Sequence, residues 1–359
     1  MKKIIILLII FILSINNVNA SVDSASEYIL MDMTTGRVLE GKNYNTPMLI
    51  ASITKIMTAT LAIESGKLDD IVIVDDIINK SYGSGIYIEV GEEITLRDLL
   101  YGLMLRSGND AALMIAKYVS DDVDKFVDAM NNKAKYIGMN NTKFSNPSGL
   151  DNEDSGNTST AYDMAILTKY AMQYDEYRKI VSTKSHTVKT NKKTYVWKNK
   201  NKLLQYNYIT GGKTGYTEKA KRTLVSTASK NNIDLVVVTI KDSDDWNTHR
   251  SLYEKTFANY TSYKVLNKNT FTVLKDTYYN NNLYIKNDVY IPLKKEETGN
   301  LLCHIKLEKL KNYKKDDKVG INEIYLNDEL IYTEDIYVSK DKSKNKKTSI
   351  YNKLKELFT

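Results

Sequence analysis

Cysteine, proline and histidine are scarce in this chain of 359 residues, which contains one cysteine and three prolines. A single cysteine, Cys303, excludes an internal disulfide, so the fold has to depend on its hydrophobic core. We expect Cys303 to be a small buried residue in a strand. The histidines His186, His249 and His304 are scattered and predict neither a metal cluster nor an obvious catalytic triad. The sequence therefore implies no metal and no cofactor.

Long hydrophobic runs are also missing, except at the N-terminus. Residues 4–15 are almost wholly apolar, which is long enough for the core of a signal peptide but short for a membrane span. Lys2 and Lys3 precede this run, and 18–20 supplies small residues where a signal peptidase cleaves. The pattern predicts a signal peptide over 1–20 and an exported protein, with an uncleaved anchor as the alternative.

The overall composition is ordinary for a globular protein, with 42% hydrophobic and 26% charged residues. The length is sufficient for one large domain and a smaller one. The formal net charge is +7. A mildly basic exported protein suits an acidic wall polymer or membrane surface, although a mixed solvated surface gives the same value. We do not expect nucleic acid as a partner.

Strands, then helices, then strands follow one another up to residue 240, which indicates an α+β fold. A hairpin is expected at 27–40, and two later strands at 223–229 and 233–240. Apolar residues recur at helical spacing between these strands, and the expected helices are 52–65, 95–105, 110–119 and 161–172. Together these elements predict one large domain over 21–265.

After about residue 265, short runs rich in Tyr, Val and Ile alternate with turn residues, which predicts a small all-β domain over 266–338. The expected strands are 270–274, 283–285, 288–293, 301–307, 320–326 and 330–337. The tail, 339–359, begins with a lysine-rich stretch and continues with an amphipathic pattern. Such a tail suits the surface of an anionic membrane, and a frayed, solvated tail is the alternative.

Three short motifs carry candidate chemistry: S-x-x-K at Ser52–Lys55, S-x-N at Ser107–Asn109 and K-T-G at Lys213–Gly215. The first two patterns also occur elsewhere in the chain, so context has to separate the candidates from chance matches. The S-x-x-K opens an apolar helix, so its serine and lysine share one face. The S-x-N lies in a tight break between two apolar helices. The K-T-G precedes strands and can form an edge with which an extended peptide pairs.

The residue types fit nucleophilic catalysis without histidine. A serine hydroxyl is a poor nucleophile until a base takes its proton, and Lys55 can be that base if its pKa is lowered. Burial and the nearby cation of Lys213 would lower that pKa. Asn109 would orient Lys55 and a substrate amide, and Ser107 would pass a proton to a leaving amine. Backbone donors would stabilise the oxyanion.

The three motifs in this order and spacing resemble those of the low-molecular-weight D-alanyl-D-alanine carboxypeptidases, which are serine penicillin-binding proteins. The resemblance runs from about residue 25 to 260. The stretches that carry it are Ala51–Thr58, Leu99–Ala116, Asn146–Leu150, Thr160–Met164, Asn201–Leu204, Gly212–Thr217 and Asp245–Trp246–Asn247 with His249. It implies a catalytic domain of the DD-peptidase/β-lactamase type, an antiparallel sheet with flanking helices.

The resemblance also implies a role for each motif residue. Ser52 would form the acyl-enzyme with Lys55 as general base, while Ser107 and Asn109 complete the proton network. Substrate would be held by Lys213, Thr214, Gly215 and Tyr216, and the backbone N–H groups of Ser52 and Tyr216 would form the oxyanion hole. The implied partners are peptidoglycan pentapeptide stems and β-lactam antibiotics. The β domain and tail resemble the family's C-terminal module and membrane anchor.

Two positions depart from the family pattern, because Ser148 stands where many relatives have His and Lys221 where they have Gly. Neither is expected to touch the three motifs. They leave the loop conformation and the substrate preference open.

Several other functions fit part of the pattern. A β-lactamase would need a dedicated deacylating base, and Glu153 with Asn157 faintly resembles such a loop. A transpeptidase or endopeptidase on the same scaffold would pass the acyl group to an amine or cut an internal bond. A phosphate-binding loop at 211–214 lacks its first glycine, because Asn207 stands there. A wall-binding module without activity would require a missing catalytic residue, and none is missing.

Overall fold

The computed structural model describes residues 24–152, 156–274 and 276–342. Within these residues, the larger part of the chain is built on an antiparallel five-stranded sheet with the strand order β2-β1-β11-β10-β9. Its strands are β1 (Ala25–Asp32), β2 (Val38–Lys42), β9 (Ile209–Thr217), β10 (Lys221–Lys230) and β11 (Ile233–Asp242). The predicted hairpin and the two predicted later strands are therefore confirmed. The strand β9 has a neighbour on one side only and forms an edge of the sheet.

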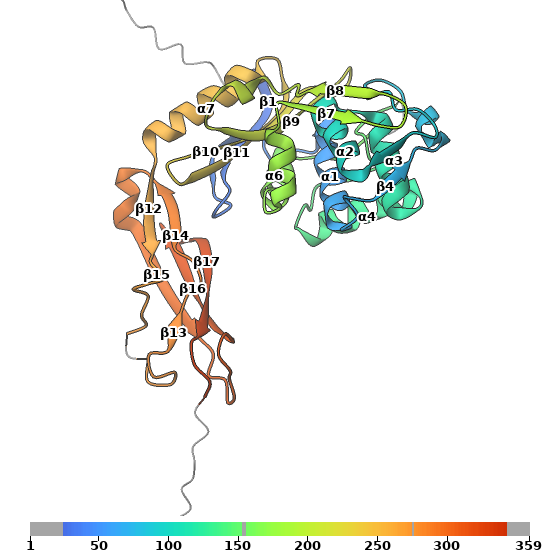
Figure 1. Cartoon of the computed structure of the whole chain (residues 1–359). Helices are drawn as coiled ribbons and strands as arrows, with labels where there is room; N and C mark the ends of the chain where they lie inside the picture. The colour runs from blue at the N-terminus through green and yellow to red at the C-terminus, as the bar shows by residue number, and fades with distance from the viewer. Residues whose placement is uncertain (1–23, 153–155, 275, 343–359) are drawn as a thin grey trace, which may run out of the picture.

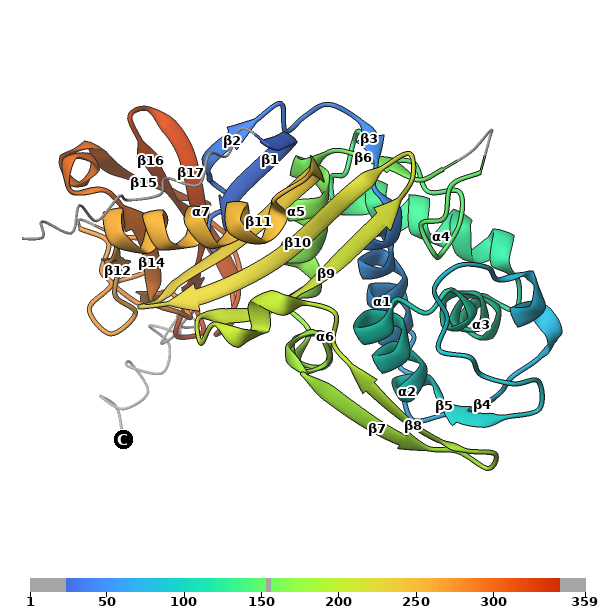
Figure 2. The same ribbon diagram turned by 90° about the horizontal axis from the view of Figure 1, so that it is seen from above.

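Helices lie on both faces of this sheet (Figure 2). Alternate residues of a strand point to opposite faces, and β11 follows this rule. Val236 and Val238 belong to the core shared with α5, while Leu235 and Val237 belong to the core shared with α7. The run of apolar residues without polar alternation is thus explained by burial on both faces.

The remaining elements of this part lie before β9 and after β11. In chain order they are β3 (Met48–Leu49), η2 (Ala51–Thr54), α1 (Lys55–Glu64), β4 (Ile71–Ile73), η3 (Asp76–Lys80), β5 (Glu93–Thr95), α2 (Leu96–Tyr101), η4 (Gly102–Arg106), α3 (Asn109–Ser120), α4 (Val123–Tyr136), β6 (Thr158–Ser159), α5 (Ala161–Ala171), α6 (Asp175–Ser182), β7 (Ser185–Lys189), β8 (Thr194–Lys198), η5 (Lys202–Gln205) and α7 (Asp245–Asn259). All four predicted helices are present. The one expected at 95–105 divides into α2 and a π-helical turn, η4.

The C-terminal strands form sheets of their own with a separate hydrophobic core. They are β12 (Thr261–Leu266), β13 (Leu283–Tyr284), β14 (Val289–Leu293), β15 (Leu301–Leu307), β16 (Lys318–Leu326) and β17 (Glu329–Val338), with the short helix η6 (Lys295–Asn300) before β15. Figure 1 shows them extending away from the first sheet beyond the end of α7. A partly buried ion pair between Arg37 and Glu297 joins the two parts.

The fold corrects two expectations and extends a third. No strand forms at 270–274, and β12 lies just before it, because Thr261–Leu266 pairs with β14. The K-T-G motif precedes the two predicted strands, as expected, but it also lies within a strand of its own, β9. Cys303 lies in a strand as expected, but it is exposed instead of buried, because β15 is the edge strand of its sheet.

Two sequence predictions fall on residues outside the described ranges: the signal peptide over 1–20 and most of the basic tail over 339–359. Among the helices that the structure describes, none combines the length and the apolar character required to cross a bilayer.

Candidate active site

Ser52 lies in the 3-10 turn η2, which continues directly into α1. The residue before it, Ala51, has a positive φ of 49°, so the backbone bends sharply and presents the serine at the start of the helix. Lys55 follows one turn later and is fully buried. Its Nζ lies 3.0 Å from the Oγ of Ser52. The two residues predicted to act as nucleophile and base are therefore in contact across one helical turn.

The amine of Lys55 is held by two further acceptors. It donates to Asn109 Oδ1 at 2.7 Å and to the backbone carbonyl of Ser148. A neutral amine has two N–H donors and one lone pair, so these two acceptors leave the lone pair for the proton of Ser52. The contact with Ser148 corrects the expectation that this position does not touch the motifs. Because the contact uses the backbone, the change from His to Ser leaves it intact.

The electrostatics favour the neutral form of Lys55. Burial lowers the pKa of its amine well below the ordinary value, and the positive charges of Lys213 and Lys200 lower it further. The carboxylate of Asp110 opposes this shift. The predicted effect of Lys213 on Lys55 is thus present, and Lys200 adds a second cation that the motifs did not indicate.

The S-x-N motif lies where the π-helical turn η4 ends and α3 begins. Ser107 adopts a left-handed conformation with φ 66°, which stops one helix and lets Asn109 start the next. The Nδ2 of Asn109 donates to the carbonyl of Tyr82 at 2.6 Å, which fixes the amide so that its oxygen faces Lys55. A helix with π geometry next to a functional site is a recurrent combination.

Lys213 approaches the same centre from β9. Its side chain is 1% exposed, and its Nζ donates to Ser107 Oγ at 3.1 Å and to the carbonyl of Thr214 at 2.6 Å. Burial, with the charge of Lys200, lowers the pKa of Lys213 to about 7. The three motifs therefore converge, as a chain of contacts runs from Ser52 through Lys55 to Asn109 and from Lys213 to Ser107.

Gly215 of the K-T-G motif allows β9 to approach the backbone of Ser52 closely. A Cβ on Gly215 would lie 2.9 Å from the backbone nitrogen of Ser52 and 2.3 Å from the hydroxyl of Thr223. Only a residue without a side chain allows this approach. The next residue, Tyr216, therefore has its backbone beside that of Ser52, and its ring is exposed. Because β9 is an edge strand, an extended peptide can pair with it at this point.

The loop over 145–150 packs against the turn that carries Ser52. Gly149 has φ 82°, and a Cβ there would lie 1.9 Å from the carbonyl oxygen of Ala51. Asn157 connects this loop to the catalytic helix, because its Nδ2 donates to Thr54 Oγ1 at 2.9 Å and its Oδ1 accepts from the backbone of Ser145. Asn157 thus has a structural role, while Glu153 lies outside the described residues.

The site opens into a cleft of about 310 Å³. Its lining includes five of the predicted residues, Ser52, Ser107, Thr214, Gly215 and Tyr216. The other three, Lys55, Asn109 and Lys213, lie buried behind it. The lining residues that the motifs did not indicate are Ser84, Lys200, Arg222, Asp245 and Trp246.

Among these unforeseen residues, Arg222 provides a cation at the rim of the cleft. Its Nε donates to Asp245 Oδ2 at 3.1 Å, and its guanidinium lies 5.6 Å from the centre of the Trp246 ring. Asp245 and Trp246 had a signal in the sequence, because they belong to a stretch that resembles the family. Arg222 and Lys200 lack such a signal, since each stands in a run of lysine and polar residues.

No histidine lies in the cleft among the described residues. The ring of His249 is enclosed between Ser226 Oγ at 2.6 Å and Thr239 Oγ1 at 3.1 Å, and burial lowers its pKa to about 3. This ring is neutral and has no route to the cleft. His186 is stacked on Tyr101, and its Nε2 contacts Asp98 at 2.7 Å. Lysine is thus the group available as a base.

Replacing Lys200 with methionine should move the pH dependence of serine acylation toward higher pH. The charge of Lys200 lowers the pKa of both buried lysines, so removing it raises both. The lower limb of the plot of acylation efficiency against pH reports the base in the free enzyme. The measurement is the second-order rate of penicillin acylation at a series of pH values. Lys198→Met removes an exposed lysine two residues away and should leave the limb in place, and an unmoved limb in both variants would contradict the coupling.

Comparison with known proteins gives a consistent assignment. The family model described as D-alanyl-D-alanine carboxypeptidase matches residues 15–244, and the one described as penicillin-binding protein 5, C-terminal domain, matches 260–344. D-alanyl-D-alanine carboxypeptidase DacF of Bacillus subtilis is 39% identical over 221 residues, which are 60% of this chain and 56% of the relative. A D-alanyl-D-alanine endopeptidase of Pseudomonas aeruginosa is 34% identical over 58% of this chain and 69% of its own length.

Solved structures agree with this result. Penicillin-binding protein 5 from Haemophilus influenzae matches with a TM-score of 0.72 and 28% identity, covering 89% of this chain and 97% of that one. The predicted fold, an antiparallel sheet with flanking helices and a C-terminal β part, is therefore confirmed. The alignment with the Bacillus subtilis relative spans little more than half of that protein. Since the matching family model covers well over half of the chain, the chain belongs to the D-alanyl-D-alanine carboxypeptidase family.

Proposed function

We propose that the protein is a serine-type D-alanyl-D-alanine carboxypeptidase that removes the terminal D-alanine from peptidoglycan pentapeptide stems. The observation that carries this proposal is the buried Lys55 amine, 3.0 Å from Ser52 Oγ and held by Asn109 and the carbonyl of Ser148. A base with this geometry and a lowered pKa is what an unactivated serine requires. The family of the chain supports the substrate class.

The proposed reaction has two steps. Lys55 takes the hydroxyl proton of Ser52 while Ser52 Oγ attacks the carbonyl of the penultimate residue. The resulting oxyanion lies against the backbone N–H groups of Ser52 and Tyr216. The proton then passes through Ser107 to the amine of the leaving D-alanine, and an ester on Ser52 remains. Water, deprotonated by Lys55, hydrolyses the ester. Lys213 and Thr214 hold the terminal carboxylate, so a free C-terminus is favoured over an internal bond.

The same residues explain penicillin binding. A β-lactam places a strained amide carbonyl and a nearby carboxylate on one rigid ring system, so the proposed anchor and nucleophile act on it as on the peptide. Its leaving amine stays tethered after acylation. Because this amine does not depart from the site as D-alanine does, a covalent adduct on Ser52 is expected to last longer than the acyl-enzyme formed with the peptide.

The test is product analysis with the purified protein, residues 21–359, and a peptide that ends in D-Ala-D-Ala. Release of free D-alanine as the main product supports the carboxypeptidase. Rapid turnover of penicillin with no D-alanine release would move the assignment to a β-lactamase. A product joined to an added acceptor amine would indicate a transpeptidase, and cleavage of an internal cross-link would indicate the endopeptidase that one relative is named for.

We also propose that the chain is divided into a signal peptide over 1–20, a catalytic domain over 21–265, a β domain over 266–338 and a tail over 339–359. The separate hydrophobic core of the C-terminal strands supports the division, and the pairing of β12 with β14 moves the boundary between the two domains from 265 to about residue 260. The relatives named D-alanyl-D-alanine carboxypeptidases and penicillin-binding proteins support a location outside the cytoplasm, at the wall or the outer face of the membrane.

Deleting residues 345–359 should release the protein from anionic membranes if the tail is an anchor. The remaining chain keeps both proposed domains, so D-alanine release by the truncated protein should be unchanged. The measurement is co-sedimentation with vesicles that contain anionic lipid, with neutral vesicles as the control. Equal sedimentation of the full and truncated proteins would contradict the anchor.

A further inference from the structure

Tyr87 combines a left-handed backbone with an exposed aromatic side chain. Its φ is 62°, and its side chain is 73% exposed. A bulky residue in this region is a backbone outlier that costs free energy, and glycine or asparagine adopts the conformation more readily. Stability alone would therefore favour a small residue here. We infer that the tyrosine ring has a function that offsets the backbone strain.

The backbone of this tyrosine is held in place from both sides. Its N–H donates to Asp110 Oδ2 at 2.7 Å, and the N–H of Ile86 donates to both oxygens of the same carboxylate at 3.0 Å. Its carbonyl accepts from Lys193 Nζ at 2.9 Å and from the hydroxyl of Tyr195 at 3.2 Å. Two consecutive N–H groups that converge on one carboxylate explain the left-handed turn.

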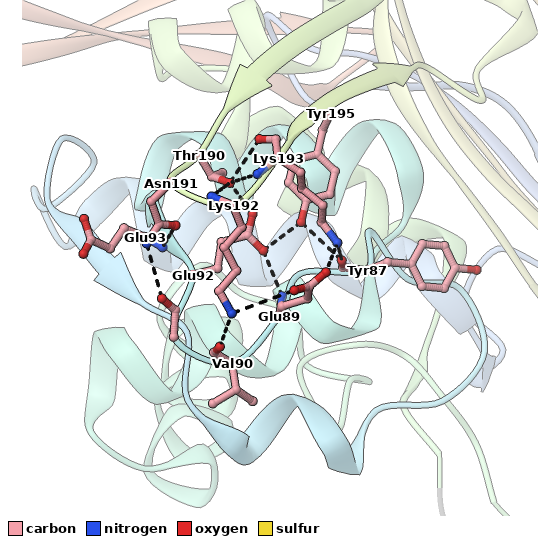
Figure 3. A network of polar contacts seen from close by, with 11 residues as sticks. Tyr87, Glu89, Val90, Glu92, Glu93, Thr190, Asn191, Lys192, Lys193 and Tyr195 are labelled. Carbon is pink, nitrogen blue, oxygen red and sulfur yellow. Dashed lines mark hydrogen bonds and ion pairs between the residues drawn. The ribbon is translucent and has the colours of Figure 1, made fainter.

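The hairpin β7–β8 secures the following segment through a polar network (Figure 3). Glu92, which is fully buried, accepts from Thr190 Oγ1 at 2.5 Å and from the Tyr195 hydroxyl at 2.8 Å. Lys193 contacts Glu89 Oε1 at 2.7 Å. Figure 3 shows the ring of Tyr87 pointing away from this network. The network thus fixes the backbone that carries the ring, while the ring itself takes no part in the network.

The held segment is continuous with the candidate active site. Asp110 follows Asn109, and the N–H of Asn109 donates to the carbonyl of Ser84 at 2.8 Å. Ser84 lines the cleft. The ring of Tyr87 lies on the side of Gly85, since a Cβ there would be 3.5 Å from its Cε1 atom. The ring therefore lies beside the backbone that continues outward from the cleft-lining Ser84.

We propose that Tyr87 is a specificity-determining residue whose ring forms a subsite for the long aliphatic side chain of the residue that precedes D-Ala-D-Ala in the stem peptide. The inference rests on the proposed function. With the terminal carboxylate at Lys213 and Thr214 and the scissile carbonyl at Ser52, the upstream residues have to leave the cleft along its walls. An aromatic face held beside the backbone that continues outward from Ser84 offers apolar contact, and attraction to a terminal amine where the side chain carries one.

The experiment compares two substrates with the full-length protein. One is N-acetyl-D-Ala-D-Ala, which lacks the preceding residue, and the other carries an L-lysine before the two D-alanines. Tyr87→Asn removes the ring while its residue type tolerates the left-handed backbone, and Tyr87→Phe keeps the ring. Tyr136→Asn is the control, since Tyr136 lies on α4 and is 78% exposed. Thermal unfolding of each variant accompanies the kinetics.

Tyr87→Asn should lower kcat/KM for the lysine peptide by about fivefold to tenfold, chiefly through KM, and should change the value for the short substrate by less than about twofold. Tyr87→Phe and Tyr136→Asn should stay within about twofold of the wild type on both. Equal losses on both substrates, or no loss on either, would overturn the subsite. Failure of the wild type to release D-alanine from either substrate would instead overturn the proposed function.

Discussion

Replacing Ser52 with alanine is expected to abolish the covalent penicillin adduct and to lower D-alanine release by at least about 10⁴-fold. The reason is that Ser52 Oγ is the hydroxyl that contacts the buried Lys55 amine, while Ser107 is engaged by Lys213. The measurement is the mass of the intact protein after incubation with penicillin. The wild type should gain the mass of one penicillin, and the variant should gain none.

Ser107, the serine of the S-x-N motif, provides the matched control. Ser107→Ala removes the proposed proton relay but leaves the nucleophile and its base in place. This variant should still form the adduct, more slowly than the wild type, because acylation keeps its nucleophile. An adduct on the Ser52→Ala protein would show that Ser52 is not the nucleophile. Loss of the adduct only in Ser107→Ala would show that the nucleophile belongs to the S-x-N motif instead.

The convergence of the three motifs is the part of the site that the sequence predicts well. The spacing of Ser52 and Lys55 follows from helical geometry alone, and the break at Ser107 is visible as a gap between two apolar helices. The structure confirms that these motifs approach one another, and that the edge strand carries the K-T-G sequence. Helical period suffices for the pair Ser52 and Lys55, because these residues are close together in the chain. The meeting of the three distant motifs is expected only from their resemblance to the family.

The contacts that the sequence does not reveal are those made by the backbone and by single residues from distant loops. The carbonyl of Ser148 contacts Lys55 whatever side chain stands at that position, so no residue type signals it. Lys200 reaches the cleft from the segment after β8, and nothing in a lysine-rich stretch distinguishes it from its neighbours. The exposure of Cys303 depends on which strand lies at the sheet edge, which only the tertiary pairing decides.

Replacing Lys55 with methionine should lower the rate of acylation by about 10³-fold. Methionine has nearly the length of lysine and fills the same buried space, but it cannot accept a proton. Burial of the amine is the main cause of its lowered pKa, so the native state binds fewer protons at this site than the unfolded chain. Below the ordinary pKa of 10.5, that difference costs the wild type stability, and the methionine variant avoids the cost.

The sign of this effect gives the pH dependence. Between the lowered native pKa of Lys55 and its ordinary value, the unfolded chain holds one more proton, so the stability of the wild type rises with pH. The wild type should therefore gain stability relative to Lys55→Met as the pH rises from neutral toward 10. Denaturant unfolding at several pH values measures this difference in stability.

Lys55→Arg tests whether a positive charge alone suffices at this position, because a guanidinium cannot act as a base and stays charged when buried. That variant should be both inactive and less stable, and an active arginine variant would show that Lys55 is not the base.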